Sequence, residues 1–280
     1  MLRVLGWGFY ILVLLVLTAL SQVGGAVLVF STLVVWSIFP SGRLGWFKGF
    51  FTHLIAFSLV YGAIAALLVP PVARIYGRVP LPCVANETAT YGALNPLTCV
   101  LNRNYAVPEV AAALTRMAEH MSNVHENSVV GYLDAGFPFF EHFPLLPHIT
   151  HRTGRDLDLA YFYTDEEGRY LPGKARSPIG YWGFVQPLAG ARQSCADAQK
   201  GLSLRWNMTW LQPLLKPYRL DEARTGELLR WLVQEGGEHG VKGVIIEPHV
   251  SEQLGVHSQL IRFQGCRAAR HDDHIHVDFD

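Results

Sequence analysis

The chain has 280 residues, half of them hydrophobic, and its formal net charge at neutral pH is zero. This balance leaves no basic surplus for nucleic acid and no charged tail, so nucleic-acid-binding functions are not expected. The apolar residues are concentrated in the first 70 positions. The remainder, roughly 200 residues, is long enough for one globular domain with its own core.

Residues 4–39 are almost free of charge. As a single helix they would extend about 54 Å at about 1.5 Å per residue, too long for one crossing of a bilayer core about 30 Å thick. The Gly-containing break at 21–25 therefore predicts two spans, 4–20 and 24–39, and a third apolar run covers 49–69. We expect about three transmembrane helices, which form a membrane anchor over residues 1–70.

Basic residues flank the expected spans and set their orientation. Arg3 precedes the first span, and Arg43 and Lys48 precede the third. Basic loops stay on the cytoplasmic side, so three spans would send the rest of the chain outward. A cleaved signal peptide is the alternative for the first span.

All four cysteines follow the apolar segment and none forms a CxxC pair. This distribution favours disulfides in an oxidising compartment, with four free thiols as the alternative. Of the three possible pairings we favour Cys83–Cys99 and Cys195–Cys266.

Residues 71–107 are rich in Pro, Asn, Thr and Gly, which predicts an extracytoplasmic linker closed by a disulfide. Residues 108–280 form the expected catalytic domain, in which helices and strands are interspersed, and the predicted fold class is therefore α+β. Helices are expected over 108–125, 204–215 and 221–234, and strands at 129–134, from 157, at 241–246, at 260–263 and at the C-terminus.

The C-terminal stretch His271-Asp272-Asp273-His274-Ile275-His276-Val277-Asp278 is unusually rich in histidine and aspartate. On a strand, alternate residues share a face, so His274, His276 and Asp278 would point one way, and Val277 and Phe279 toward the core. Such a strand can present two imidazoles to one metal, or one to the metal and one to the reaction.

A second stretch, starting at His148, supplies partners for this strand. A turn at Gly154 would bring His151 and Asp158 to one point. Asp158 lies within the apolar run 157–162, where an unpaired carboxylate is costly to bury and metal coordination would offset that cost. Two histidines and one carboxylate are the protein ligands of many catalytic zinc sites, so we predict that His151, Asp158 and His276 bind Zn²⁺.

The remaining polar residues receive supporting roles. His274 is the predicted general base and acid, with Glu247 as an alternative, while His148 and His271 would orient water or stabilise an oxyanion. Four carboxylates are candidates to hold imidazole tautomers: Asp156, Asp272, Asp273 and Asp278. Three arginines either contact substrate carboxylates or lie on a solvated face: Arg262, Arg267 and Arg270. His249 and His257 are expected at the surface.

The two stretches together resemble the penicillin-insensitive murein endopeptidases, within the wider group of LAS metallopeptidases that share the hedgehog-like fold. The resemblance rests on His148-x-x-His151-x-Thr153-Gly154-x-Asp156-x-Asp158 and on the C-terminal motif, and it covers about residues 129–280. It implies an antiparallel sheet, Zn²⁺ bound by His151, Asp158 and His276, His274 as the catalytic histidine, and His148 and His271 as further active-site histidines.

The resemblance also implies a function, the hydrolysis of peptide cross-links in murein at a D-Ala-containing bond. We therefore expect a multi-pass protein of the bacterial inner membrane whose catalytic domain is periplasmic. Its expected partners are the peptidoglycan peptide and the lipid bilayer, and the sequence identifies no protein partner. The alternatives are a carboxypeptidase that uses the same site, and a non-catalytic, zinc-bound peptidoglycan-binding or scaffold protein.

Overall fold

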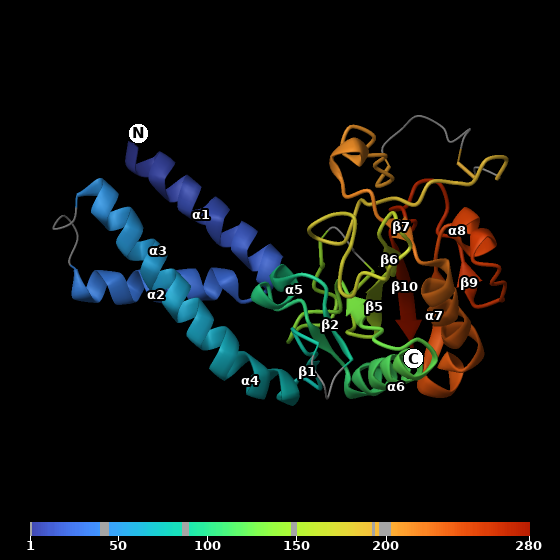
Figure 1. Ribbon diagram of the computed structural model, residues 1–280. Helices are drawn as coiled ribbons and strands as arrows, with labels where there is room; N and C mark the ends of the chain where they lie inside the picture. The colour runs from blue at the N-terminus through green and yellow to red at the C-terminus, as the bar shows by residue number, and fades with distance from the viewer. Residues whose placement is uncertain (1, 40–44, 86–89, 147–149, 192–193, 196–202) are drawn as a thin grey trace.

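The computed structural model describes residues 2–39, 45–85, 90–146, 150–191, 194–195 and 203–280. The chain has an α+β architecture, as expected from its sequence. Apolar helices extend to one side of the molecule, and a sheet covered by helices and long loops forms the other side (Figure 1).

The first helices are α1 (Leu2–Ser21), α2 (Gly24–Ile38) and α3 (Trp46–Ala63), close to the three apolar segments expected. A π-helical turn, η1 (Ile64–Leu68), continues α3 into α4 (Val69–Ile75). Within the described residues, only the 30-residue stretch Trp46–Ile75 is long and apolar enough to cross a membrane, judged by length and composition. The apolar stretches Trp7–Ser21 and Gly24–Ile38 are shorter. The fifteen residues of α2 extend only about 22 Å, less than a bilayer core of about 30 Å. By length and composition the described residues therefore contain one candidate membrane span, whereas three were expected.

Six strands form one sheet in the described part of the chain, in the order β2-β4-β5-β10-β8-β9. Its strands are β2 (Tyr91–Ala93), β4 (Val130–Tyr132), β5 (Asp156–Ala160), β8 (Val241–Ile245), β9 (Ile261–Arg262) and β10 (His274–Phe279). The four central strands pair antiparallel, but β2 pairs parallel with β4, and β9 with β8. The sheet is therefore mixed, which corrects the expectation of an antiparallel sheet.

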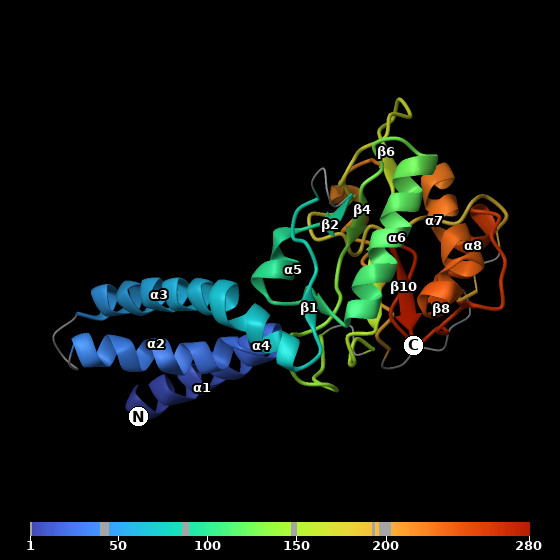
Figure 2. The same cartoon turned by 90° about the horizontal axis from the view of Figure 1, so that it is seen from below.

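Two long helices cover one face of this sheet. They are α6 (Pro108–Val124) and α7 (Glu222–Gln234), which lie side by side (Figure 2). The Asp221 side chain accepts a hydrogen bond from the Arg224 backbone N–H at 3.0 Å, so it caps the N-terminus of α7. The apolar face of both helices packs on Ile275, Val277 and Phe279 of β10 in one core. Strand alternation then turns the intervening histidines to the opposite face.

The central strand β10 is aligned with β5 so that His276 lies opposite Asp158. This register brings together the two sequence stretches that were expected to form a metal site. His274 lies opposite Ala160 on the same pair of strands.

The segment expected to be a linker contributes to the folded domain. Besides β2, it includes α5 (Pro96–Val100) and the short strands β1 (Val79–Pro80) and β3 (Tyr105–Ala106), which pair with each other. Leu81, Tyr91 and Ala106 belong to the main core. Turn-forming residues such as Pro and Asn do not reveal these short elements, because their partners lie far away in the sequence.

Two disulfides join Cys83 to Cys99 and Cys195 to Cys266, which confirms the expected pairing. By contrast, the helix expected over 204–215 is wrong. Only η2 (Gln212–Leu214) is helical there, and Trp206 and Trp210 are exposed. The remaining short elements are β6 (Tyr163–Thr164), which pairs with β7 (Arg219–Leu220), η3 (Gly236–His239) and α8 (Pro248–Gln253).

The apolar helices contact the domain through specific hydrogen bonds. The Tyr61 hydroxyl of α3 donates to the Val100 carbonyl at 2.7 Å and accepts from the Asn102 side chain at 2.9 Å. The Gln22 side chain accepts a hydrogen bond from the Phe139 N–H at 2.9 Å. The helices are therefore docked on the domain at the end of α5, at Asn102 just after it, and at the loop that contains Phe139.

The turn between His151 and Asp158 depends on Gly154, whose φ is +68°. A Cβ at this position would overlap the buried Arg78 guanidinium. Gly154→Ala should therefore lower the free energy of unfolding by more than the ~1–2 kcal/mol that a left-handed alanine costs.

Gly168→Ala is the matched control, because Gly168 also has a positive φ but open space around its Cβ position. Denaturant unfolding of the detergent-solubilised chain, followed by tryptophan fluorescence, measures both variants. Equal losses of stability in the two variants would contradict the role given to the Arg78 contact.

Candidate metal centre

Three side-chain atoms lie close together on the sheet face opposite α6 and α7. They are Nε2 of His151, Nδ1 of His276 and Oδ1 of Asp158. The distance from Asp158 Oδ1 is 2.8 Å to His276 Nδ1 and 3.0 Å to His151 Nε2, and the two nitrogens are 3.2 Å apart. All three residues are almost completely buried. The structure thus brings together the three predicted ligands.

In each of the two histidines, one ring nitrogen faces Asp158 and the other faces away from it. The hydrogen bond of the nitrogen that faces away determines which of the two carries the hydrogen. His151 Nδ1 lies 2.5 Å from the Ala135 carbonyl, which can only accept, so Nδ1 carries a hydrogen. His276 Nε2 likewise donates to Asp278 Oδ1 at 3.1 Å. In the neutral forms, therefore, both imidazoles direct a lone pair toward Asp158 Oδ1.

This donor set fits a zinc ion. Metal–nitrogen distances of about 2.0–2.1 Å in a tetrahedron place neighbouring ligand atoms about 3.3 Å apart. The three distances here, 2.8, 3.0 and 3.2 Å, are about 0.1–0.5 Å shorter than this value. The Asp278 carboxylate and the Ala135 carbonyl are the outer partners that ligand histidines normally have. Three lone-pair donors facing one another are unfavourable unless a cation or proton lies among them, so the residues present match the predicted cofactor.

A second group of possible ligands consists of Asp156, His276 and Asp278. Asp156 and Asp278 are only half-buried, and His276 can serve this group only through Nε2, the nitrogen that donates to Asp278. We therefore take the buried group as the candidate metal centre and Asp278 as the residue that orients His276.

His274 lies beside the centre with its Nε2 3.7 Å from Asp158 Oδ1. Its Nδ1 donates to Asp273 Oδ1 at 2.5 Å, which fixes the ring and makes Nε2 the acceptor nitrogen of the neutral form. Burial alone would lower the pKa of His274, but Asp158 and Asp273 outweigh burial and raise it. A histidine held by a carboxylate in this way is well suited to accept a proton.

Of the other four histidines with an expected role or place, one joins this cluster, one is buried elsewhere, one is exposed and one lies outside the described residues. The His271 ring is 4.8 Å from that of His274 and 6.0 Å from that of His276, centroid to centroid, so it belongs to the same cluster. His148 lies outside the described residues. His249, expected at the surface, is buried, and its Nε2 donates to the Val185 carbonyl at 3.0 Å. His257 is exposed as expected.

The carboxylates separate into two groups. Asp273 and Asp278 hold imidazoles as expected. Asp272 instead pairs with Arg270, and Glu247 forms a two-pronged ion pair with Arg205 at 2.7 and 2.9 Å. Because both Glu247 oxygens bind this guanidinium, His274 is the better-placed base. Arg262 lies 3.8 Å from Asp278 and Arg270 lines a cleft beside His274.

Sequence reasoning missed Tyr181, Asp134 and Arg103. The Tyr181 hydroxyl is 2.7 Å from Asp158 Oδ2 and 2.9 Å from Asp134 Oδ2, and Arg103 pairs with Asp134. Burial, with Asp134 and Asp158, raises the pKa of Tyr181 well above its usual range, so the hydroxyl stays protonated. Asp134 ends a predicted strand and was therefore identifiable as a candidate, whereas Tyr181 lies in a long loop without periodicity.

No family model matches this sequence, and no curated protein resembles it closely enough to be counted as a relative.

Substitution of the three ligands should separate metal binding from other roles. His151→Ala, Asp158→Ala and His276→Ala should each lose stoichiometric zinc, whereas His274→Ala should retain it. Metal analysis of the purified, dialysed chain measures this. Loss of zinc from His274→Ala would make His274 a ligand and overturn the division of roles.

Zinc uptake near neutral pH should release about one proton, because a ligand imidazole must be neutral. Burial alone would lower the pKa of His276, but hydrogen bonds to Asp158 and Asp278 raise it to about 10, so the metal-free side chain is protonated. Calorimetric titration in buffers of different ionisation enthalpy counts the released protons.

Asp278→Asn replaces the charged acceptor of His276 Nε2 by a neutral one, which lowers the pKa of His276, so zinc uptake by this variant should release fewer protons. A binding enthalpy that does not depend on the buffer would contradict the protonated metal-free state.

Proposed function

We propose that this chain is a zinc-dependent peptidase of the murein endopeptidase type, which hydrolyses peptide cross-links of peptidoglycan. The observation that carries the proposal is the arrangement of His151, Asp158 and His276 around one point, with His274 and Asp273 beside it. Two histidines and a carboxylate with an adjacent base are the requirements of zinc-dependent amide hydrolysis. The choice of murein as substrate rests on the resemblance of the two motifs.

The chemistry divides between the metal and the chain. Zinc held by the three ligands would polarise the scissile carbonyl and lower the pKa of a water molecule to about 7. His274 Nε2 takes the proton of the attacking water, whose oxygen adds to the carbonyl carbon, and returns it to the leaving nitrogen as the C–N bond breaks. Asp273 holds the His274 ring and stabilises the imidazolium that forms between these two transfers.

His271 would stabilise the developing oxyanion. Its Nδ1 contacts the Ala269 carbonyl at 3.1 Å, which orients the ring, and the ring packs against those of His274 and His276. The same proposal assigns this role also to His148.

The helices and the disulfides support the proposed location. In this proposal three helices anchor the chain in a bacterial inner membrane, α1 and α2 as a short hairpin and Trp46–Ile75 as the full crossing. Two disulfides in the domain favour an oxidising compartment, so the domain faces the periplasm, where murein lies.

The fold proposed for residues 108–280 is the LAS metallopeptidase fold. The central antiparallel strands support it, since they place the first ligand pair on β5 and its preceding turn, and the last ligand on β10.

Product mapping on purified sacculi tests the function. The zinc-loaded chain should release peptides whose cross-links are cut at a D-Ala-containing bond, and His274→Ala should lower this rate by about a hundredfold to ten-thousandfold while it retains zinc. Chelation of the metal should abolish release, and added zinc should restore it.

Cross-linked dimers and monomers with free D-Ala-D-Ala ends distinguish the two peptidase activities. Cleavage of the monomers alone would make the chain a carboxypeptidase. Binding to sacculi without any product would favour the non-catalytic alternative, and the proposed function would then be wrong.

A further inference from the structure

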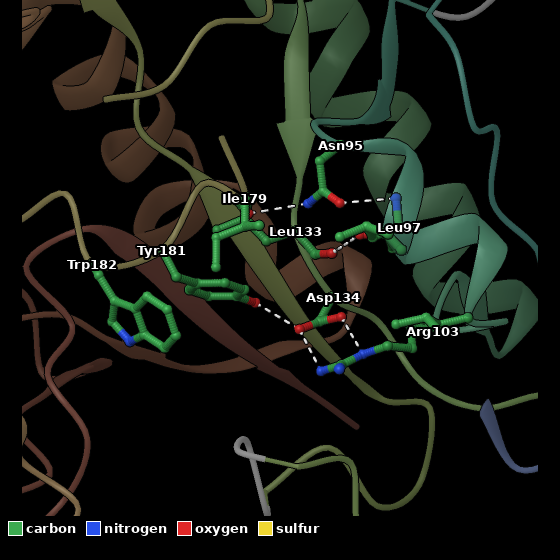
Figure 3. A pocket seen from close by; sticks show the side chains of 10 residues that line it. Asn95, Leu97, Arg103, Leu133, Asp134, Ile179, Tyr181 and Trp182 are labelled. Carbon is green, nitrogen blue, oxygen red and sulfur yellow. Dashed lines mark hydrogen bonds and ion pairs between the residues drawn. The ribbon is translucent and has the colours of Figure 1, made fainter. Parts of the chain in front are cut away.

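Tyr181 connects two buried carboxylates at the side of the candidate metal centre. Its hydroxyl lies between Asp158 Oδ2, at 2.7 Å, and Asp134 Oδ2, at 2.9 Å. Figure 3 shows its ring between Trp182 and Ile179, with the hydroxyl directed at Asp134. The ring also packs edge-on against His274, at 5.1 Å between centroids. Tyr181 therefore contacts a metal ligand and the proposed base.

A phenol has one hydrogen, so Tyr181 can donate to only one of the two carboxylates at a time. Asp134 has another strong partner: Arg103 binds it through Nε and Nη2, both at 2.7 Å (Figure 3). This two-pronged, charge-assisted pair balances the charge of Asp134. The Tyr181 hydrogen is thus available to Asp158 Oδ2.

The two oxygens of Asp158 have different surroundings. Oδ1 faces both ligand nitrogens, at 2.8 and 3.0 Å, whereas Oδ2 accepts from Tyr181. A carboxylate can bind a metal through one oxygen or through both. If both oxygens bound, they would occupy the position that catalytic zinc sites keep for water or substrate.

We propose that Tyr181 is a positioning residue that restricts Asp158 to coordination through Oδ1 alone. This inference rests on the proposed zinc site, and it assigns to a loop residue the control of the coordination number. The hydrogen bond to Oδ2 competes with the metal for that oxygen. It thereby keeps one coordination position available beside His274.

The loop around Tyr181 is held firmly enough for this task. Trp182 has a φ of +66°, a costly conformation for a bulky residue that persists only where the surroundings impose it. The Tyr181 carbonyl accepts from the Ser177 hydroxyl at 2.5 Å, and the Trp182 carbonyl accepts from Gln212 at 2.7 Å. The Trp182 N–H donates to Asp273, the carboxylate that orients His274. One loop therefore positions both the ligand and the base.

Cobalt substitution of the full-length, detergent-solubilised chain tests the proposal, because the visible absorption of Co²⁺ weakens when four-coordinate geometry becomes five-coordinate. Tyr181→Phe should retain stoichiometric Co²⁺ but show the weaker, five-coordinate spectrum. Its turnover on cross-linked peptide should fall about 10–100-fold, with little change in KM.

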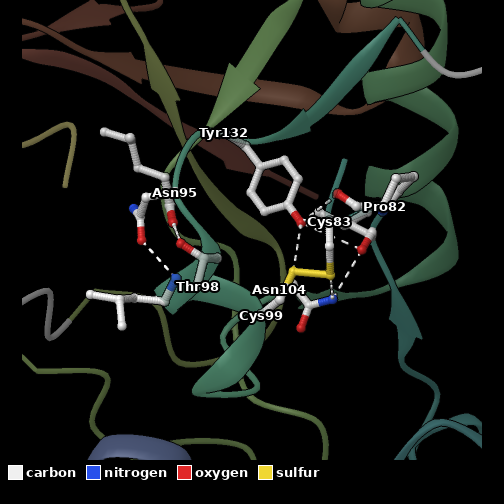
Figure 4. The surroundings of a disulfide bond; sticks show 10 residues. Pro82, Cys83, Asn95, Thr98, Cys99, Asn104 and Tyr132 are labelled. Atoms are coloured by element: carbon white, nitrogen blue, oxygen red, sulfur yellow. Dashed lines mark hydrogen bonds between the residues drawn. A yellow bond between two sulfur atoms is a disulfide. The ribbon is translucent and has the colours of Figure 1, made fainter. Parts of the chain in front are cut away.

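Tyr132→Phe is the matched control. Tyr132 is also a fully buried tyrosine, but its hydroxyl donates to the Pro82 carbonyl at 2.9 Å beside the Cys83–Cys99 disulfide (Figure 4). Its Co²⁺ spectrum should match that of the unmodified chain. A spectral change of equal size in both variants would mean a general loss of packing and would overturn the proposal.

Two other outcomes for Tyr181→Phe would also overturn it: an unchanged four-coordinate spectrum, or loss of the metal. If Tyr181→Phe does not fold, Asp134→Asn provides a second test. This change removes the charged carboxylate that competes for the Tyr181 hydrogen, so the hydroxyl still donates to Asp158 Oδ2. A four-coordinate Co²⁺ spectrum is therefore expected, and a five-coordinate spectrum would contradict the inference. Because the spectra need no substrate, failure of the murein assay would reject the proposed function without affecting this test.

Discussion

The buried carboxylate of Asp158 is the constraint on which the rest of this structure depends. It is fully buried in the central strand β5, where an unpaired charge would be strongly destabilising. Its Oδ1 contacts two histidines and its Oδ2 contacts Tyr181. Each of these partners is held in turn by a further group: Asp278, the Ala135 carbonyl and Asp134. The residues that balance the buried charge of Asp158 are therefore the same residues that form the candidate metal centre and its surroundings.

Strand alternation makes such a network compatible with a hydrophobic core. On β10 the residues Ile275, Val277 and Phe279 pack in the core with α6 and α7, whereas His274 and His276 on the opposite face approach Asp158. A slip of one residue would bury the histidines against the helices and expose the apolar side chains. The stability of the core thus enforces the register His276–Asp158, and this register brings the candidate ligands together.

The parts of the site that lie on regular elements could be predicted from the sequence. Alternation placed His274, His276 and Asp278 on one face, and the apolar run around Asp158 indicated a buried charge in need of partners. Tyr181 and Arg103 could not be found in this way. They reach the site from loops, and their positions depend on hydrogen bonds to residues more than 20 positions away. No local pattern encodes such distant contacts, and for the same reason β2 was hidden in a segment that looked like a linker.

Hydrogen bonds also connect the candidate metal centre to the apolar helices. Arg103, at the outer end of the network, follows Asn102 and Val100, which hydrogen-bond to Tyr61 of α3. The segment after α5 therefore serves two purposes: it docks the helices and it balances the charge of Asp134. A flexible tether would need neither hydrogen bond. If Trp46–Ile75 crosses the membrane, these hydrogen bonds hold the domain at a fixed height and orientation above it, and under the proposed function only the part of the cell wall within that reach is available to the site.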